Sequence, residues 1–151
     1  MIVTTCVTCG QRHRFVKKIE NMEEDYVSLE TAKLLKEKGF TVPICTYYFT
    51  VNNNELNFAF ESDWNNTWEH AYSAPTLWDA MKWLRNYHHL HIIPEISDPS
   101  QLNPKYYVVI WDTTPKRKSY ILDLFDSYEE ACEEGIKYCL ENLINNEQNI
   151  E

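Results

Sequence analysis

Residues 105–125 read KYYVVIWDTTPKRKSYILDLF and decide the fold. Two runs rich in aromatic and β-branched residues, 105–111 and 119–125, flank a basic turn at 113–118. This arrangement predicts a β-hairpin. The first run is apolar on both of its faces, so we predict that it forms a central strand.

Two further stretches predict strands on the N-terminal side of this hairpin. Residues 42–51 are rich in Tyr, Phe and Thr, three asparagines follow, and apolar residues alternate over 56–60, which predicts a second hairpin with one apolar face. Residues 91–96 predict one more strand. Pro94 cannot donate a backbone hydrogen bond, so we expect this strand at a sheet edge.

Three stretches predict helices, because each has a Ser or Thr cap, then a large apolar residue, and Ala four positions after the cap. The caps are Ser28, Thr76 and Ser127, and the expected helices cover 29–38, 77–89 and 128–143. The order of elements indicates an α+β fold, with a mostly antiparallel sheet of two hairpins plus an edge strand and three helices packed mainly on one face.

The expected domain boundaries follow from the same pattern. Residues 1–26 show no sustained helical or strand period and are interpreted as a lead-in. Residues 27–144 should form a single α+β domain. The polar stretch 145–151 should fray as a tail.

The helix expected over 77–89 contains two tryptophans and two histidines, with a third histidine just beyond it. At 100° per residue, one arc should be buried and the tryptophans should lie on its flanks. The residues of the arc are Leu77, Ala80, Met81, Leu84, Tyr87 and His88. His88 and His89 point about 100° apart on a helix, which argues against a metal site shared with His91. The segment is therefore interpreted as structural.

The N-terminal stretch carries the best metal-ligating pattern. Cys6 and Cys9 form a CxxC motif followed by Gly10, and His13 could supply a third ligand to zinc. A structural zinc site needs four ligands, and no second half at knuckle spacing follows. We therefore expect no cofactor, with zinc at Cys6, Cys9 and His13 as an alternative.

Residues 61–72, ESDWNNTWEHAY, are the best candidate for a binding surface. We predict that Trp64, Trp68, His70 and Tyr72 contact a partner or ligand, since aromatic residues give large contact area at small entropic cost. The alternative is that both tryptophans cover the core. Asp63 and His70 could pair, but no nucleophile elbow, phosphate loop, HExxH or paired-acid motif accompanies them, so we expect no enzymatic activity.

Charge and composition narrow the function further. The formal net charge of −9 disfavours binding to nucleic acid, which usually requires a basic surface. No run of apolar residues is long enough to cross a membrane. Five cysteines without an export signal favour free thiols. We expect a cytoplasmic protein that binds neither nucleic acid nor a membrane.

Three stretches together carry a resemblance. They are YVSLETAKLLKEKGF at 26–40, YSAPTL at 72–77 with KWLR at 82–85, and SYEEA at 127–131. Over about 26 to 143 the chain resembles small uncharacterised proteins carried by phages and mobile elements of Bacteroides-type gut bacteria. Members usually begin near Val27, so the cysteine-bearing leader departs from the pattern. The resemblance implies a phage-infected bacterial cytoplasm and assigns no activity or functional residue.

The function expected from these observations is that of a non-enzymatic accessory protein of a phage or mobile element, which binds a host or phage protein. One alternative is a small-molecule protein that stacks a nucleotide-like base on Trp or Tyr, with phosphate held by a base such as Arg85 or Lys116. A further alternative is a small zinc-binding domain that uses the N-terminal CxxC.

Overall fold

The computed structural model describes residues 3–5, 12–14, 25–51 and 53–144. Strands β1 (Val3–Thr5) and β2 (Arg12–Arg14) form an antiparallel pair within the stretch expected to be a lead-in. The expected tail, 145–151, lies outside the described residues. The remaining strands make two three-stranded antiparallel sheets with helices, so the predicted α+β class is confirmed.

The large sheet contains β6 (Leu90–Ile96), β7 (Tyr106–Asp112) and β8 (Lys118–Phe125), in the order β6-β7-β8. Strand β7 is central and the proline-bearing β6 lies at an edge, as predicted. Val108 and Ile110 of β7 are fully buried against the helices, which places the core on one face of this sheet.

The small sheet contains β3 (Ile44–Phe49), β4 (Leu56–Ser62) and β5 (Ala71–Ser73), in the order β4-β3-β5. Strand β5 was not expected. It forms because residues 71–73 pair with Tyr47–Phe49 of β3, and this pairing separates the small sheet from β6.

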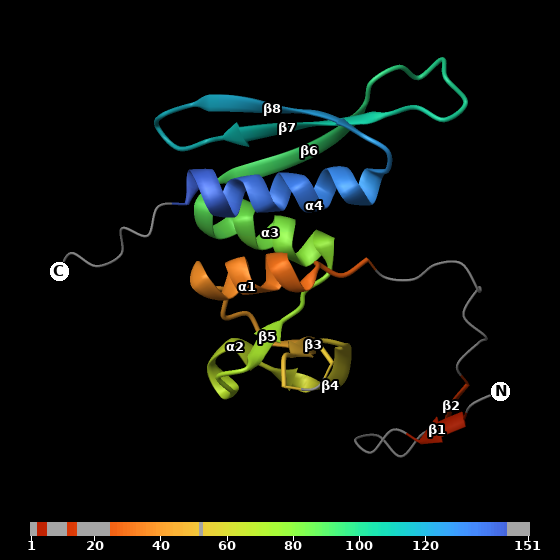
Figure 1. Cartoon of the computed structure of the whole chain (residues 1–151), viewed down its shortest axis with the longest axis vertical. Coiled ribbons are helices and arrows are strands. Elements are labelled where there is room, and N and C mark those ends of the chain that lie inside the picture. Colours follow the sequence, from red (N-terminus) through yellow and green to blue (C-terminus); the bar gives the residue numbers. More distant parts are fainter. Residues whose placement is uncertain (1–2, 6–11, 15–24, 52, 145–151) are drawn as a thin grey trace.

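Helices α1 (Leu29–Glu37), α3 (Leu77–His88) and α4 (Tyr128–Tyr138) lie between the two sheets (Figure 1). The strands were expected to make one sheet, whereas they make two. The physical reason is that α3 begins four residues after β5 and leads directly into β6, so the chain crosses the helical layer between the sheets. The helices therefore cover the inner face of both sheets.

The three predicted caps are confirmed. The hydroxyl groups of Ser28, Thr76 and Ser127 each accept a hydrogen bond from the backbone N–H three residues later. Gly39 adopts φ +82 just after α1, as expected for a left-handed cap. The last predicted helix changes at Cys139 into a π-helical turn, η1 (Cys139–Leu143).

The buried arc of α3 is displaced from its expected position. Tyr87 was expected to be buried but is 68% exposed, whereas Trp83, expected on the flank, is 6% exposed. Phe40, which follows α1, packs edge-on against Trp83 with ring centroids 5.4 Å apart and draws that indole into the core. His88 is half-buried, and burial lowers its pKa.

Candidate functional site

The segment expected to be a binding loop is largely ordered secondary structure. Residues Trp64–Thr67 form the short helix α2, and Tyr72 lies in β5. The side-chain amide of Asn65 fixes this arrangement: Nδ2 donates to the Phe40 carbonyl at 2.7 Å, and Oδ1 accepts from the Ser73 N–H at 2.9 Å. One buried side chain thus ties α2 both to the end of α1 and to β5.

Trp64 is a core residue of the small sheet. It is 1% exposed, and its indole N–H donates to the Ile44 carbonyl at 2.7 Å. Its ring stacks on Tyr47 at 4.2 Å between centroids and also contacts Phe60 and Trp68. For Trp64 the alternative prediction holds, because this tryptophan belongs to a core. Its side chain is too buried to contact a partner directly.

Trp68 and His70 remain accessible. Trp68 is 50% exposed and contacts Tyr47 and Phe49 on the outer face of β3. Together these side chains line an open hollow of about 490 Å³, which we call the Trp68 hollow. Its lining residues are Tyr47, Phe49, Asn57, Trp68, Glu69 and His70.

Tyr72 does not belong to this hollow. It pairs with Tyr48 in the register of β5 on β3, and both side chains pack against the core that lies on the helical side. The Lys36 ammonium lies 4.7 Å from the centre of the Tyr72 ring. The structure thus brings Trp68 and His70 together and separates them from Tyr72 and from the buried Trp64.

Lys36 of α1 holds in place the backbone of the segment that carries Trp68. Its ammonium donates to the carbonyls of Trp68 at 3.3 Å, Glu69 at 2.9 Å and Ala71 at 2.9 Å. Burial lowers the pKa of this lysine, while the charges of Glu69 and Asp63 oppose that shift. All three N–H donors are engaged, so the lysine serves the loop and leaves no donor for a ligand.

The surroundings of the Trp68 hollow are acidic. Residues 41–75, which supply both sheet and loop, contain no Lys or Arg, and their acids are Glu55, Glu61, Asp63 and Glu69. Asp63 accepts a hydrogen bond from the Asn66 amide at 2.6 Å, and no hydrogen bond joins it to His70 in the described part of the chain. The hypothetical Asp63–His70 pair is therefore absent from this geometry.

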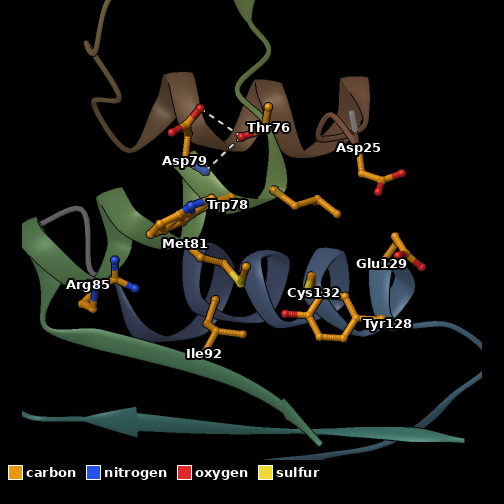
Figure 2. Close-up of a pocket in the computed structure, with 11 residues that line it drawn as sticks. Asp25, Thr76, Trp78, Asp79, Met81, Arg85, Ile92, Tyr128, Glu129 and Cys132 are labelled. Atoms are coloured by element: carbon orange, nitrogen blue, oxygen red, sulfur yellow. Dashed lines mark hydrogen bonds between the residues drawn. The ribbon is translucent and has the colours of Figure 1, made fainter. Parts of the chain in front are cut away.

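A second and wider hollow, of about 770 Å³, lies between α3, the start of α4 and β6. Figure 2 shows Met81, Ile92 and Tyr128 at its apolar floor. No local sequence pattern marks this hollow, because its lining comes from four separate segments. The lining residues are Asp25, Thr76, Leu77, Trp78, Asp79, Met81, Arg85, Ile92, Tyr128, Glu129 and Cys132.

The charged residues of this second hollow are mostly acidic. Asp79 is engaged by the Thr76 hydroxyl at 2.9 Å, and the Arg85 guanidinium lies 5.4 Å from the Trp78 ring centre. Within the described residues, neither Asp25 nor Glu129 forms a side-chain ion pair. Three carboxylates against one guanidinium make the hollow more favourable to a cation than to a phosphate.

The zinc site predicted at the N-terminus is not tested by the described residues. Cys6 and Cys9 lie outside the described residues, and His13 is described only by its backbone, which pairs with Thr4 in the β1–β2 ladder. Among residues 25–51 and 53–144, no group of three or more potential ligands gathers in metal-binding geometry. Cys132 and Cys139 are buried in α4 and η1, and burial raises the pKa of Cys132 to about 11 and that of Cys139 to about 12.

No family model, curated protein or solved structure matches the chain. Within the described part of the chain, no helix has the length and apolar character needed to span a bilayer.

Proposed function

We propose that the protein acts by binding another protein through the Trp68 hollow. The observation that carries this proposal is a half-exposed indole held in a fixed position: Trp68 rests on Phe49 and Tyr47, and Lys36 holds the backbone of its loop. A rigid aromatic side chain beside a concave surface is typical of an interaction hot spot, because little conformational entropy is lost on binding.

The partner surface that fits this hollow is an extended segment with a large apolar residue next to Lys or Arg. The apolar residue would fill the hollow beside Trp68, and the base would meet the acids of a region that has no positive residue of its own. Strand β4 lies at the edge of the small sheet and offers free backbone groups to such a segment. Phe60, which is 73% exposed and contacts Trp64, extends the apolar surface along that edge.

The resemblance to phage and mobile-element proteins supports an infected bacterial cytoplasm as the setting for this binding role. A protein that handles nucleic acid would supply the basic segment required, because such proteins carry clustered Lys and Arg. The acidic chain would then bind the partner without binding its nucleic acid.

Selection from a library of random 12-residue peptides tests the proposal. We expect the wild type to enrich peptides in which Lys or Arg adjoins an aromatic or aliphatic residue. Trp68→Ala should weaken binding of these peptides roughly 30-fold, the loss expected when a central aromatic anchor worth about 2 kcal/mol is removed. Amide exchange of residues 56–62 should slow in the bound state.

Trp78→Ala is the matched control, since Trp78 is 55% exposed on α3 and lies outside the Trp68 hollow. It should bind the selected peptides like the wild type. Equal binding by Trp68→Ala and the wild type, or enrichment of acidic peptides, would contradict the proposal.

The hollow in Figure 2 supports a second candidate function, binding of a small molecule with an apolar body and a cationic group. Met81 and Ile92 would contact the body, and the carboxylates of Asp25 and Glu129 would meet the cation. Its electrostatics favour an amine over the nucleotide-like ligand considered from sequence.

Thermal denaturation with tryptamine and with adenosine monophosphate separates these two ligand classes. Tryptamine should raise Tm in a concentration-dependent manner, since it binds only the native state, and the nucleotide should leave Tm unchanged. Glu129→Gln should reduce the tryptamine shift, whereas Glu141→Gln, an exposed acid outside the hollow, should not. A shift produced by the nucleotide alone would exclude the amine assignment.

A further inference from the structure

The outer face of the large sheet, which we call the large-sheet face, is more apolar than a solvated face requires. An antiparallel sheet with one face in water usually alternates apolar residues inward and polar residues outward. Here the outward residues include Ile93, Trp111 and Ile121, which are 41%, 48% and 72% exposed. The helices pack on the opposite face, and nothing in the described part of the chain covers this one (Figure 1).

The strand register gathers these residues into a compact row. Ile93 of β6 is paired with Val109 of β7, which is in turn paired with Ile121 of β8. The next pair toward the turn is His91 with Trp111, and the next toward the other end is Glu95 with Tyr107. The apolar row therefore crosses the middle of the sheet with polar residues at both ends.

The two ends of the large-sheet face carry opposite charge. The turn between β7 and β8 ends with three consecutive exposed bases, Lys116, Arg117 and Lys118. At the other end, the outer strands present Glu95 on β6 and Asp123 on β8, both exposed. Glu95 accepts a hydrogen bond from the Tyr107 hydroxyl, and Asp123 forms no ion pair among the described residues. The charge thus changes sign along the strand direction.

We propose that this face binds a second copy of the chain. A two-fold axis through the central row, perpendicular to the strands, would stack the two Ile93–Val109–Ile121 rows on each other. The same axis would place the basic turn of each copy over the acidic end of its partner. Two sheets packed face to face lie about 10 Å apart with their strands nearly aligned, and this arrangement would bring the two rows into contact.

A second copy fits better than an unrelated partner, because one symmetry operation satisfies both the apolar row and both charged ends. The attraction between opposite ends also offsets part of the repulsion between two chains of net charge −9. Three strands of seven or eight residues make a footprint of roughly 24 Å by 14 Å. Two such footprints bury roughly 700 Å² in total, below the roughly 1,200 Å² of standard specific interfaces, so we expect a weak dimer that dissociates at about 100 micromolar.

Sedimentation velocity of the full chain across a concentration series tests the proposal. The wild type should show a reversible monomer–dimer equilibrium. Ile121→Lys should weaken association at least tenfold, because it buries an unpaired charge in the apolar row. Phe60→Lys is the matched control: Phe60 is 73% exposed, against 72% for Ile121, but lies on the small sheet. It should dimerise like the wild type, and circular dichroism should confirm that both variants are folded.

A charge-exchange experiment tests the relative orientation of the copies. Variant A carries Lys116→Glu and Arg117→Glu, and variant B carries Glu95→Lys and Asp123→Lys. Each variant alone places like charges at both contacts and should be monomeric. An equimolar mixture restores opposite charges at both contacts and should dimerise as the wild type does. Dimerisation of each variant alone, with no gain on mixing, would overturn the two-fold arrangement.

Three further results would overturn the proposal. The wild type could remain monomeric at several hundred micromolar, or Phe60→Lys could abolish the dimer while Ile121→Lys leaves it intact. A monomer in which Trp111 is protected from chemical oxidation would show that another segment of the chain covers the face. None of these results bears on peptide binding at the Trp68 hollow, so this inference and the proposed function fail independently.

Discussion

The two sheets are attached to the same helical layer by different forces. The large sheet is held by close packing: Gly135 of α4 brings the helix so near that an added Cβ would lie 2.9 Å from Cγ2 of Ile92 and 3.1 Å from Cγ1 of Val108. The small sheet packs fewer fully buried apolar side chains on this layer and is also tied by hydrogen bonds to backbone carbonyls. Thr46 donates to Ala74 at 2.6 Å, and Tyr48 donates to Val27 at 2.8 Å.

This difference explains why the small sheet needs an aromatic cluster on its outer face. Strands β3 and β5 bury only a few large apolar side chains on the helical side, so Trp64 forms a separate small core on the other side. Sheets of this size require a packed face for stability. The small sheet is thus packed on both faces, whereas the described part of the chain leaves the outer face of the large sheet uncovered.

Replacement of Trp64 should have the largest effect. Trp64→Ala removes a fully buried indole and its hydrogen bond to Ile44, and we expect the free energy of unfolding to fall by about 3–5 kcal/mol. Urea denaturation measures this loss. Trp68→Ala, a half-exposed neighbour, should cost far less. Equal losses for the two variants would mean that the small sheet has no core of its own.

Overpacking at Gly135 should come next. Gly135→Val forces a branched side chain against Ile92 and Val108, and we expect a loss of about 3 kcal/mol in unfolding free energy. Gly135→Ala should lose less, because alanine favours the helix by about 1 kcal/mol over glycine. Combining Gly135→Ala with Ile92→Leu, which removes the Cγ2 methyl at 2.9 Å, should recover stability. No recovery would show that the contact with Ile92 does not limit the approach of α4.

Alkaline pH should weaken the helical layer through its buried thiols. Burial raises the pKa of Cys132 to about 11 and of Cys139 to about 12, above the ordinary value of 9.0. Below pH 9 the stability that the two buried, neutral thiols contribute is fully present. Between pH 9 and the folded pKa the unfolded chain releases protons that the folded chain retains, so each thiol lowers stability by up to about 1.4 kcal/mol per pH unit.

Between pH 8 and pH 10 we therefore expect the free energy of unfolding to fall by about 3 kcal/mol through these two groups. Cys139→Ala should remove about half of that fall. Cys45→Ala, which removes an exposed thiol of the small sheet, is the control and should leave the pH dependence unchanged. An unchanged dependence in Cys139→Ala would show that this thiol already ionises in the native state.

The smallest effect is expected at Ser73 of β5. Its hydroxyl is buried, and no hydrogen-bond partner for it lies among the described residues. Ser73→Ala removes an unsatisfied polar group, so we expect stability to stay unchanged or to rise by up to about 1 kcal/mol. Thr46→Ala, in which a satisfied buried hydroxyl is lost, should instead reduce stability. Destabilisation by Ser73→Ala would reveal an undetected partner of that hydroxyl.

Local signals in the sequence determined most of the secondary structure. The caps Ser28, Thr76 and Ser127 and the apolar run of β7 depend on interactions within a few residues, so they could be read without knowledge of the fold. The sequence also showed that 105–111 is apolar on both faces. It could not show that one of those faces would meet the helices and the other would be left open.

Only the tertiary structure decided how the strands were divided between two sheets and which side chains were buried. Three long-range contacts account for the differences: β5 pairs with β3, Phe40 draws Trp83 into the core, and Asn65 ties α2 to two distant segments. The last of these decides that Trp64 is buried while Trp68, four residues later, remains accessible. Such contacts join residues far apart along the chain, so the local periodicity of apolar residues cannot predict them.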